Sequence, residues 1–347
     1  MTFISVCIPA YNRPELLTEL LDSILKQDFD DYEIVICEDH SPKRKEIASV
    51  VAAYSIQNSQ RIRYFENEVN LGYDANLRRL LEKAQGDYCL FMGNDDLMCD
   101  GALNHVCEAL KRHPNVGVLL RSYASFEGVP TNIVQEFRYF NQETFFPAGA
   151  QTISTIYRRS VVISGMVVHR HAALALSSAH FDGTLLYQLY LVANILVKMN
   201  AVYLPEIITL YRNGGVPDFG NSEKEKGKFV PTEQTPESSL HFMQGMLDIV
   251  TYTEKTSDVV IYKPILEDIG NYSYPIIAIQ FGKSLPVFLK YCWGLAKLGF
   301  WKNKMFYFYF VTILILGVRR TDNIIAFFKR RMGYTLVIGS VYKGKQS

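Results

Sequence analysis

The sequence lacks the features that mark several common classes of protein. It contains no C-x-x-C pair and no Cys/His cluster, so nothing in it indicates a zinc site. Its six cysteines stand singly in apolar runs, and we interpret them as reduced core thiols of a cytosolic protein. The first residues show neither a basic segment nor a small-residue cleavage site, which argues against a secretory signal.

Long apolar runs are also missing. The uncharged stretch Met305–Val318 has fourteen residues and would extend about 21 Å as a helix, less than the roughly 30 Å hydrocarbon core of a membrane. Acidic residues are scarce in the same region: residues 283–347 hold twelve Lys or Arg and one acid, Asp322, a formal charge of +11. The whole chain has a formal charge of +1, so residues 1–282 carry a formal charge of −10. This asymmetry indicates an anionic partner for the tail.

Short β-rich runs and stretches with helical apolar spacing alternate through the first 120 residues. This alternation predicts an α/β fold, a mostly parallel central sheet with flanking helices on both faces. The following segment is mixed, with one further strand and one strong helix expected at Leu185–Met199. The predicted strands are Ile4–Pro9, Tyr32–Cys37, Ile62–Phe65, Tyr88–Met92, Val116–Leu120 and Val161–His169.

Composition divides the chain into three parts. The alternating and mixed region, residues 1–212, reads as one domain. Residues 213–239 are rich in Gly, Pro, Ser, Glu and Lys, and we interpret them as a flexible loop or linker. Residues 240–347 are helical in pattern, and they become aromatic and basic toward the end.

Carboxylates follow two of the predicted strands directly. Asp95 and Asp96 come after Tyr88–Met92, and Asp39 comes after Tyr32–Cys37. Because ligands bind at the carboxyl ends of parallel strands, these side chains are candidates for one site. Two alternatives stay open at this point: Asp95 or Asp96 caps the helix expected after residue 101, and Asp39 closes a local Asx turn.

An ordered set of short motifs resembles glycosyltransferase family 2, whose members have the GT-A fold. The resemblance covers about residues 1–212, and it implies a nucleotide-diphospho-sugar transferase fold followed here by a helical C-terminal region. The Gly-Asn-Asp-Asp version at residues 93–96 and the later Phe181-Asp182-Gly183 look most like the abequosyltransferase branch of O-antigen synthesis. In chain order the motifs are Ile4 to Arg13, Glu38-Asp39-His40-Ser41, Asn70-Leu71-Gly72, Ala84 to Tyr88 and Asn94-Asp95-Asp96.

The resemblance implies a role for each matching position. Asp95 would hold a divalent metal, Mn²⁺ or Mg²⁺, on the diphosphate of the donor, where a hard cation neutralises the leaving group. Asp96 would flank that metal, and Asp39 would accept a hydrogen bond from the nucleotide base. Gly93 stands where the family usually has a further carboxylate toward the ribose, which leaves that contact to Asn94, to backbone or to another group. The other implied substrate-binding residues are Pro9, Tyr11, Arg13 and Asn70, with simple rim packing as the alternative for Tyr11.

Asp182 matches the position where the family supplies a general base for the acceptor hydroxyl. It could equally cap the helix expected at Leu185–Met199. One base acting in a direct displacement implies inversion at the anomeric carbon. Arg212 either pairs with phosphate or lies on the surface, and Tyr187 and Gln188 are candidates for the wall of the sugar pocket.

The tail combines aromatic residues with flanking cations, a pattern typical of helices that lie in a membrane interface. The alternative is a helical bundle that packs on the catalytic domain with solvated basic residues. Nucleic-acid binding fits the charge of the tail but not its continuous apolar core. We therefore predict a peripheral protein on the cytoplasmic side of the inner membrane.

These observations together predict an inverting glycosyltransferase of the hexosyl- or deoxyhexosyltransferase type. Its donor would be a nucleotide-sugar, and its acceptor a lipid-linked saccharide in O-antigen or other surface polysaccharide synthesis. A sugar-phosphate nucleotidyltransferase is the first alternative, although a glycine-rich phosphate loop is absent from residues 9–14. The second is a non-catalytic nucleotide-sugar or membrane-binding homologue, which the missing carboxylate at Gly93 favours.

Overall fold

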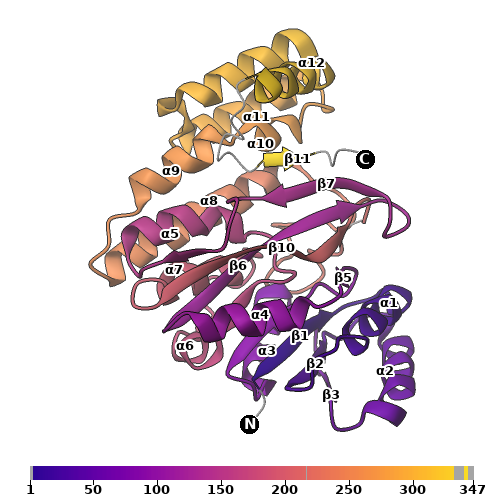
Figure 1. The fold of residues 1–347 in the computed structure, drawn as a ribbon. Coiled ribbons are helices and arrows are strands. Elements are labelled where there is room, and N and C mark those ends of the chain that lie inside the picture. The colour runs from indigo at the N-terminus through magenta and orange to yellow at the C-terminus, as the bar shows by residue number, and fades with distance from the viewer. Residues whose placement is uncertain (1–2, 216, 332–339, 343–347) are drawn as a thin grey trace.

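The computed structural model describes residues 3–215, 217–331 and 340–342. Its strands form one mixed sheet with the order β11-β7-β6-β9-β4-β1-β2-β3, and β10 joins β6, β5 and β8 beside this path (Figure 1). The strands are β1 (Ile4–Ala10), β2 (Tyr32–Glu38), β3 (Ile62–Glu66), β4 (Tyr88–Phe91), β5 (Leu97–Met98), β6 (Val116–Phe126), β7 (Ile133–Arg138), β8 (Thr144–Phe146), β9 (Val167–His169), β10 (Asn200–Arg212) and β11 (Ser340–Tyr342).

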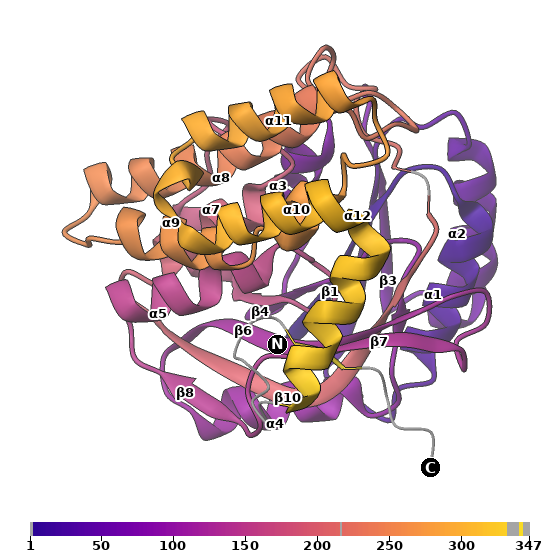
Figure 2. The same cartoon turned by 90° about the horizontal axis from the view of Figure 1, so that it is seen from above.

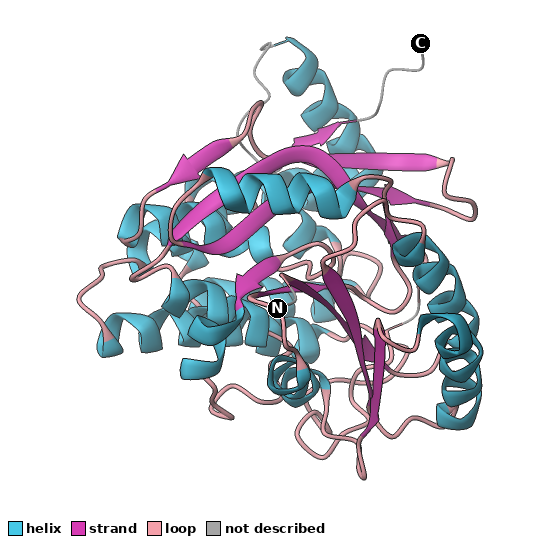
Figure 3. Ribbon diagram, turned by 60° about the horizontal axis from the view of Figure 1, so that its bottom comes forward, coloured by secondary structure: helices cyan, strands magenta, loops and turns pink. Residues whose placement is uncertain are grey.

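Helices cover both faces of this sheet (Figure 3). The helices are α1 (Pro14–Leu25), α2 (Arg44–Asn58), α3 (Tyr73–Lys83), α4 (Ala102–Arg112), α5 (Ala150–Ile156), α6 (Arg170–Ala175), α7 (Tyr187–Ile195), α8 (Pro236–Thr256), α9 (Tyr262–Asn271), α10 (Tyr274–Ala278), α11 (Leu285–Lys297) and α12 (Lys304–Arg331), with short 3₁₀ turns η1 (Tyr157–Ser160) and η2 (Phe300–Lys302).

The N-terminal half of the sheet is parallel, as predicted. β1 pairs in parallel with β2 on one side and with β4 on the other, and β2 pairs in parallel with β3. β1, β2 and β4 are mostly apolar because helices cover both faces of the sheet, whereas the edge strand β3 is only partly buried. The polar residues that follow β1, β2 and β4 therefore meet at one edge of the sheet. Beyond β4 the sheet becomes mixed, since β9 runs antiparallel to both β4 and β6.

Two predicted elements are shorter than the sequence pattern indicated. The strand expected at Val161–His169 covers only Val167–His169, because Arg121 holds the preceding backbone in a bend: its Nε donates to the carbonyl of Ser164 and its Nη2 to that of Val162. The helix expected at Leu185–Met199 covers Tyr187–Ile195, and the chain then turns into β10. β10 was not predicted, although it forms long parallel pairing with β6.

The C-terminal helices share a hydrophobic core with the rest of the molecule. One cluster of buried residues runs from Cys7 on β1 through Leu189 on α7 and Val250 on α8 to Ile313 on α12. A second cluster fills the other face of the sheet, under α1, α2 and α4. The buried side of the tail thus packs on the rest of the molecule, as the alternative of a helical bundle expects. The predicted domain boundaries at residues 212 and 239 stay a prediction.

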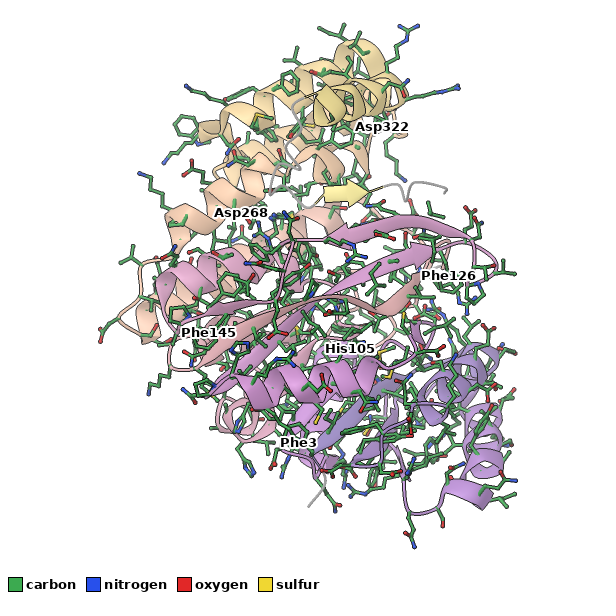
Figure 4. All side chains as sticks on the ribbon, in the orientation of Figure 1. Phe3, His105, Phe126, Phe145, Asp268 and Asp322 are labelled. Carbon is green, nitrogen blue, oxygen red and sulfur yellow. The ribbon has the colours of Figure 1, made fainter. Side chains whose placement is uncertain are left out.

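The tail helices lie at the end of the molecule away from β1, as Figure 4 shows with Asp322 at one end and Phe3 at the other. α12 consists of two halves that meet at an angle at Gly317, whose φ of 74° interrupts the helix (Figure 2). None of the helices in the described part of the chain combines the length and the apolar character that are needed to cross a bilayer.

The outer face of α11, η2 and α12 keeps large apolar side chains exposed. Trp293 is 65% exposed and Trp301 54%, and each lies under a lysine ammonium, those of Lys297 and Lys302 respectively. The other exposed apolar side chains of this face are Leu285, Val287, Leu289, Tyr307, Phe308, Val311, Leu314 and Ile315. We call this set the aromatic face of the tail.

Candidate active site

A pocket of about 290 Å³ opens at the carboxyl ends of β1, β2 and β4. Eight of the nine residues predicted for the site line it: Pro9, Tyr11, Arg13, Asp39, Asn70, Asn94, Asp95 and Asp96. The two acid-ended strands thus contribute carboxylates to one pocket, and the roles assigned to these residues stay predictions. Neither Asp95 nor Asp96 caps the next helix, because α4 begins after Gly101 without a side-chain cap.

Asp39 binds a distant turn rather than its own. Its Oδ1 accepts the backbone N–H of Leu71 at 2.9 Å and the amide of Asn67 at 2.8 Å, and its Oδ2 accepts the N–H of Gly72 at 2.9 Å. The alternative of a local Asx turn is wrong. Burial raises the pKa of Asp39 to about 6, even though these hydrogen bonds favour the charged form. Oδ2 keeps capacity for one more donor, which a nucleotide base can supply.

Arg13 lies between two acids in the pocket. Its Nη1 forms an ion pair with Asp95 Oδ2, and its Nε lies 3.4 Å from Asp218 Oδ2. Tyr11, two residues earlier, lines the same wall, and its pKa is raised by burial and by the charges of Asp218 and Asp39. The pocket therefore presents charged groups of both signs to a ligand.

Asp96 is nearly inaccessible and holds its surroundings together. Ser164 Oγ donates to its Oδ2, and the backbone N–H of Arg212 donates to its Oδ1 at 3.0 Å. Burial, followed by the adjacent charge of Asp95, raises the pKa of Asp96 to about 7. Arg212 also donates through Nε to the carbonyl of Asp95 at 3.0 Å. It therefore holds the backbone that carries Asp95 and lies in the lining of the pocket rather than on the surface.

Asn94 clamps the turn that carries Arg13. Its amide donates to the carbonyls of Tyr11 at 3.2 Å and of Asn12 at 3.1 Å. The residue before it, Gly93, leaves little room for a side chain. A Cβ there would lie 3.1 Å from Asp96 Oδ2 and 3.2 Å from Asp95 Oδ1, so a side chain at this position would require the neighbouring acids to shift slightly.

The donor set fits a divalent metal that arrives with a phosphate ligand. No group of three or more His, Cys, Asp or Glu side chains within the described residues is arranged to hold a metal alone. Asp95, however, presents a carboxylate to the pocket at 23% exposure. Mg²⁺ is commonly held by one or two carboxylates together with substrate phosphates, and Asp95 meets that requirement.

Asp182 is the ninth predicted residue, and it is absent from the described lining of the pocket. Both of its carboxylate oxygens accept from the Arg78 guanidinium at 2.8 Å, and its side chain is 7% exposed. The prediction that it caps the following helix is wrong. Asp74, on α3, accepts the backbone N–H groups of residues 183, 184, 185 and 187 at 2.8–3.0 Å, because it reaches across to this turn.

Tyr187 and Gln188, the other candidates for the sugar pocket, are buried and also absent from its described lining. Gln188 donates through Nε2 to the carbonyl of Val161 at 2.9 Å. It therefore supports the segment before Val162–Ser164, which does line the pocket. We assign Gln188 an indirect, positioning contact.

The segment 213–239, expected to be a linker, forms one wall of the pocket. Glu225 is 4% exposed and accepts the backbone N–H of Tyr73 at 2.8 Å, and Gly183 has no room for a Cβ because Lys224 O lies 2.2 Å from that position. The polar composition of this segment gave no indication that it packs against the pocket. The lining residues that the sequence did not single out are Tyr73, Asn76, Val162, Ile163, Ser164, Tyr211, Gly215, Pro217, Asp218, Phe219 and Glu225.

Comparison with known sequences points to one family. Residues 5–173 match the model of Glycosyl transferase family 2. Abequosyltransferase RfbV of Salmonella typhimurium is 37% identical over 100 residues, which are 29% of this chain and 30% of that protein. The GalNAc(5)-diNAcBac-PP-undecaprenol beta-1,3-glucosyltransferase of Campylobacter jejuni is 35% identical over 105 residues, which are 30% of this chain and 33% of that protein. The matched stretches thus span about a third of these curated relatives.

Solved structures share the fold at low sequence identity. S. aureus TarS 1–349 in complex with UDP-GlcNAc has a TM-score of 0.59 at 18% identity and covers 86% of this chain and 80% of that one. The mannosyltransferase PcManGT of Pyrobaculum calidifontis, in complex with GDP-Man and Mn²⁺, has a TM-score of 0.50 at 15% identity and covers 96% and 81%. The predicted GT-A fold, with a helical C-terminal region, is confirmed.

Proposed function

The chain carries a glycosyltransferase family 2 domain across residues 5–173, and on that premise we propose that it transfers a sugar from a nucleotide-sugar donor to a saccharide acceptor. The observation that carries the proposal is the convergence of Arg13, Asp39 and Asp95 from three strand ends on one pocket. A sugar-phosphate nucleotidyltransferase would need a phosphate loop after β1, and that position holds a strained turn clamped by Asn94 instead.

We assign the two ends of the pocket to the two ends of the donor. Asp39, beside the 70–72 turn, accepts a hydrogen bond from the nucleotide base through the remaining capacity of Oδ2. Arg13 and Asp95 lie where the diphosphate would bind. Asn94 has its amide engaged in the clamp on Tyr11 and Asn12, so it contributes shape and not a direct ribose hydrogen bond through Nδ2.

A divalent cation held by Asp95, Mn²⁺ or Mg²⁺, would supply charge neutralisation at the departing diphosphate. The Mn²⁺ in the PcManGT complex supports this assignment by analogy of fold. Asp96 contributes by holding Ser164 and the backbone of Arg212, which fixes the loop on which Asp95 is presented.

We retain Asp182 as the proposed general base in an inverting displacement. Each oxygen of its carboxylate accepts one hydrogen bond from Arg78 and keeps capacity for one more donor, so the hydroxyl of an acceptor can bind there without loss of the pair. Arg78 also lies 5.6 Å over the ring of Tyr187. The alternative is that Asp182 only pairs with Arg78 and has no role in catalysis, and separate replacement of the two residues distinguishes these possibilities.

The acceptor that we propose is a lipid-linked saccharide of surface polysaccharide synthesis. The name of the Campylobacter relative specifies a diphospho-undecaprenol acceptor, and the Salmonella relative is an abequosyltransferase. The aromatic face of the tail, with its lysines, suits attachment to an anionic membrane surface, and it supports our proposal of a peripheral protein on the cytoplasmic side of the inner membrane.

A transfer assay tests the proposed function. The full chain is incubated with Mn²⁺, a membrane lipid extract and one nucleotide-sugar at a time, and release of the nucleoside diphosphate is measured. We expect one donor to give release that depends on the extract and that is lost in Asp95→Asn. Release from none of the donors, or equal release by the variant, would contradict the proposal.

A further inference from the structure

The pocket already contains a cation on the carboxylate that is proposed to hold the metal. Arg13 Nη1 pairs with Asp95 Oδ2, and the same guanidinium approaches Asp218 on the opposite wall through Nε at 3.4 Å. All three side chains line the pocket and are partly accessible, at 23%, 23% and 31% exposure. The Arg13 side chain therefore bridges the end of β4 and the loop 213–239, which forms one wall of the pocket.

Arg13 occupies this place from a strained backbone. Asn12 and Arg13 both have left-handed conformations, with φ of 54° and 58°, which residues with a Cβ rarely adopt. The Asn94 amide donates to the carbonyl of Tyr11, just before the strained pair, and to that of Asn12 within it. Strain that is held in place beside a functional site commonly serves the site. Here it directs the guanidinium onto Asp95.

We propose that Arg13 competes with a divalent cation for Asp95, and that it exchanges this carboxylate for the diphosphate of the donor. The inference rests on the proposed function, because it takes Asp95 as the metal ligand. Arg13 Nη1 pairs with Oδ2 of Asp95, and two cations on one carboxylate oxygen repel each other, so a metal that coordinates Oδ2 displaces Arg13. A diphosphate offers the planar guanidinium a bidentate anionic partner within the same pocket.

The exchange predicts effects of opposite sign from a single substitution. Removing the Arg13 charge unmasks Asp95, so the affinity for a metal alone rises. It also removes a phosphate partner, so the affinity for a diphosphate alone falls. A residue that merely supports the fold would lower both affinities when it is replaced.

The experiment measures both affinities on the full chain. Binding of Mn²⁺ alone is followed by electron paramagnetic resonance, and binding of inorganic pyrophosphate alone is followed by calorimetry in chelator. For Arg13→Gln we expect Mn²⁺ to bind at least about fivefold more tightly and pyrophosphate at least about fivefold more weakly, the lower end of usual coupling between sites. Arg44→Gln is the matched control, because Arg44 pairs with Glu66 and lies outside the described pocket lining. It changes the net charge equally, and we expect neither affinity to move.

Each other result overturns the exchange. Both affinities falling in Arg13→Gln indicates a structural role, and a change no larger than in Arg44→Gln indicates only long-range charge. Arg13→Lys is the second variant in case Arg13→Gln does not fold. It keeps the charge, so its Mn²⁺ affinity should stay at the wild-type level, and a rise would overturn the proposal. Failure of the proposed metal site is seen separately, as Mn²⁺ binding that persists when Asp95→Asn is added to Arg13→Gln.

Discussion

Glu225 Oε1 accepts the backbone N–H of Tyr73 at 2.8 Å and thereby joins the loop 213–239 to the first turn of α3. Its second oxygen accepts the N–H of Gly220 at 2.9 Å. Phe219 adds an edge-on aromatic contact with Tyr73, at 5.5 Å between ring centres. A segment of linker-like composition is thus held against the pocket by one buried carboxylate.

Glu225→Ala should therefore destabilise the protein and weaken nucleotide binding. The substitution leaves two buried N–H groups without their acceptor, and each such loss costs about 1–3 kcal/mol. We expect the free energy of unfolding in urea to fall by about 2–4 kcal/mol. Glu223→Ala is the control, because Glu223 is 84% exposed and forms only a surface pair with Lys226. Equal unfolding curves for the two variants would show that the buried contact contributes nothing.

Nucleotide-sugar binding should weaken in acid through Asp39. Burial raises its pKa to about 6, so the carboxylate is charged at neutral pH and protonates as the pH falls through 6. Protonation removes the acceptor for the base N–H, and a single group of this pKa weakens binding about tenfold between pH 8 and pH 5. A nucleotide-sugar is the suitable probe, because its diphosphate diester does not titrate in this range.

The comparison is made by calorimetry on wild type and Asp39→Asn. The variant should bind the nucleotide-sugar more weakly than wild type at pH 8. Between pH 8 and pH 5 its affinity should fall by about tenfold less than that of wild type. An identical acid-dependent loss in both proteins would remove Asp39 as the titrating group.

Asp182 and Arg78 form a pair whose two members can be replaced separately. Because the pair is largely buried, either Asp182→Asn or Arg78→Met should lower the free energy of unfolding, by up to about 3–5 kcal/mol. The base role predicts an additional effect of Asp182→Asn, a loss of turnover of about 10²–10⁴-fold with donor binding retained. If the two variants lose turnover equally and in proportion to their stability, Asp182 is a structural partner alone.

The aromatic face of the tail should bind anionic vesicles. Trp293→Glu with Trp301→Glu places two acids among the lysines of this face, and sedimentation with phosphatidylserine vesicles should fall sharply, since each interfacial charge contributes about 1 kcal/mol. Ile56→Glu is the matched control, because Ile56 on α2 is 82% exposed outside this face. Vesicle binding that is unchanged in the tryptophan variant would contradict the membrane assignment.

The sequence predicted those parts of the structure that depend on local pattern. The apolar runs before Asp39 and Asp95 are strands whose residues are buried except for the partly exposed Tyr88, and their shared parallel direction brings the two acids to one pocket. Pro14 begins α1, a position that its fixed φ suits. These features follow from residues that are adjacent in the chain, which is why periodicity and turn residues were enough to find them.

The sequence did not reveal the contacts between distant residues. Arg78 lies 104 positions before Asp182, and Asp74 replaces Asp182 as the acceptor for the turn at 183–187. Glu225 is buried and accepts the backbone N–H of Tyr73, 152 positions earlier in the chain, as well as that of Gly220 in its own loop. No local pattern encodes these pairings, so a base, a cap and a linker were each assigned to residues whose partners the sequence did not reveal.

We propose above all that this pocket binds a nucleoside diphosphate with a cation on Asp95. Thermal unfolding of the full chain with each common nucleoside diphosphate, with and without Mn²⁺, tests it most directly. We predict that at least one of them raises the unfolding temperature of the wild type more with Mn²⁺ than without it, and that Asp95→Asn abolishes this additional rise. An equal additional rise in the variant, or no rise with any nucleoside diphosphate, would contradict the proposal.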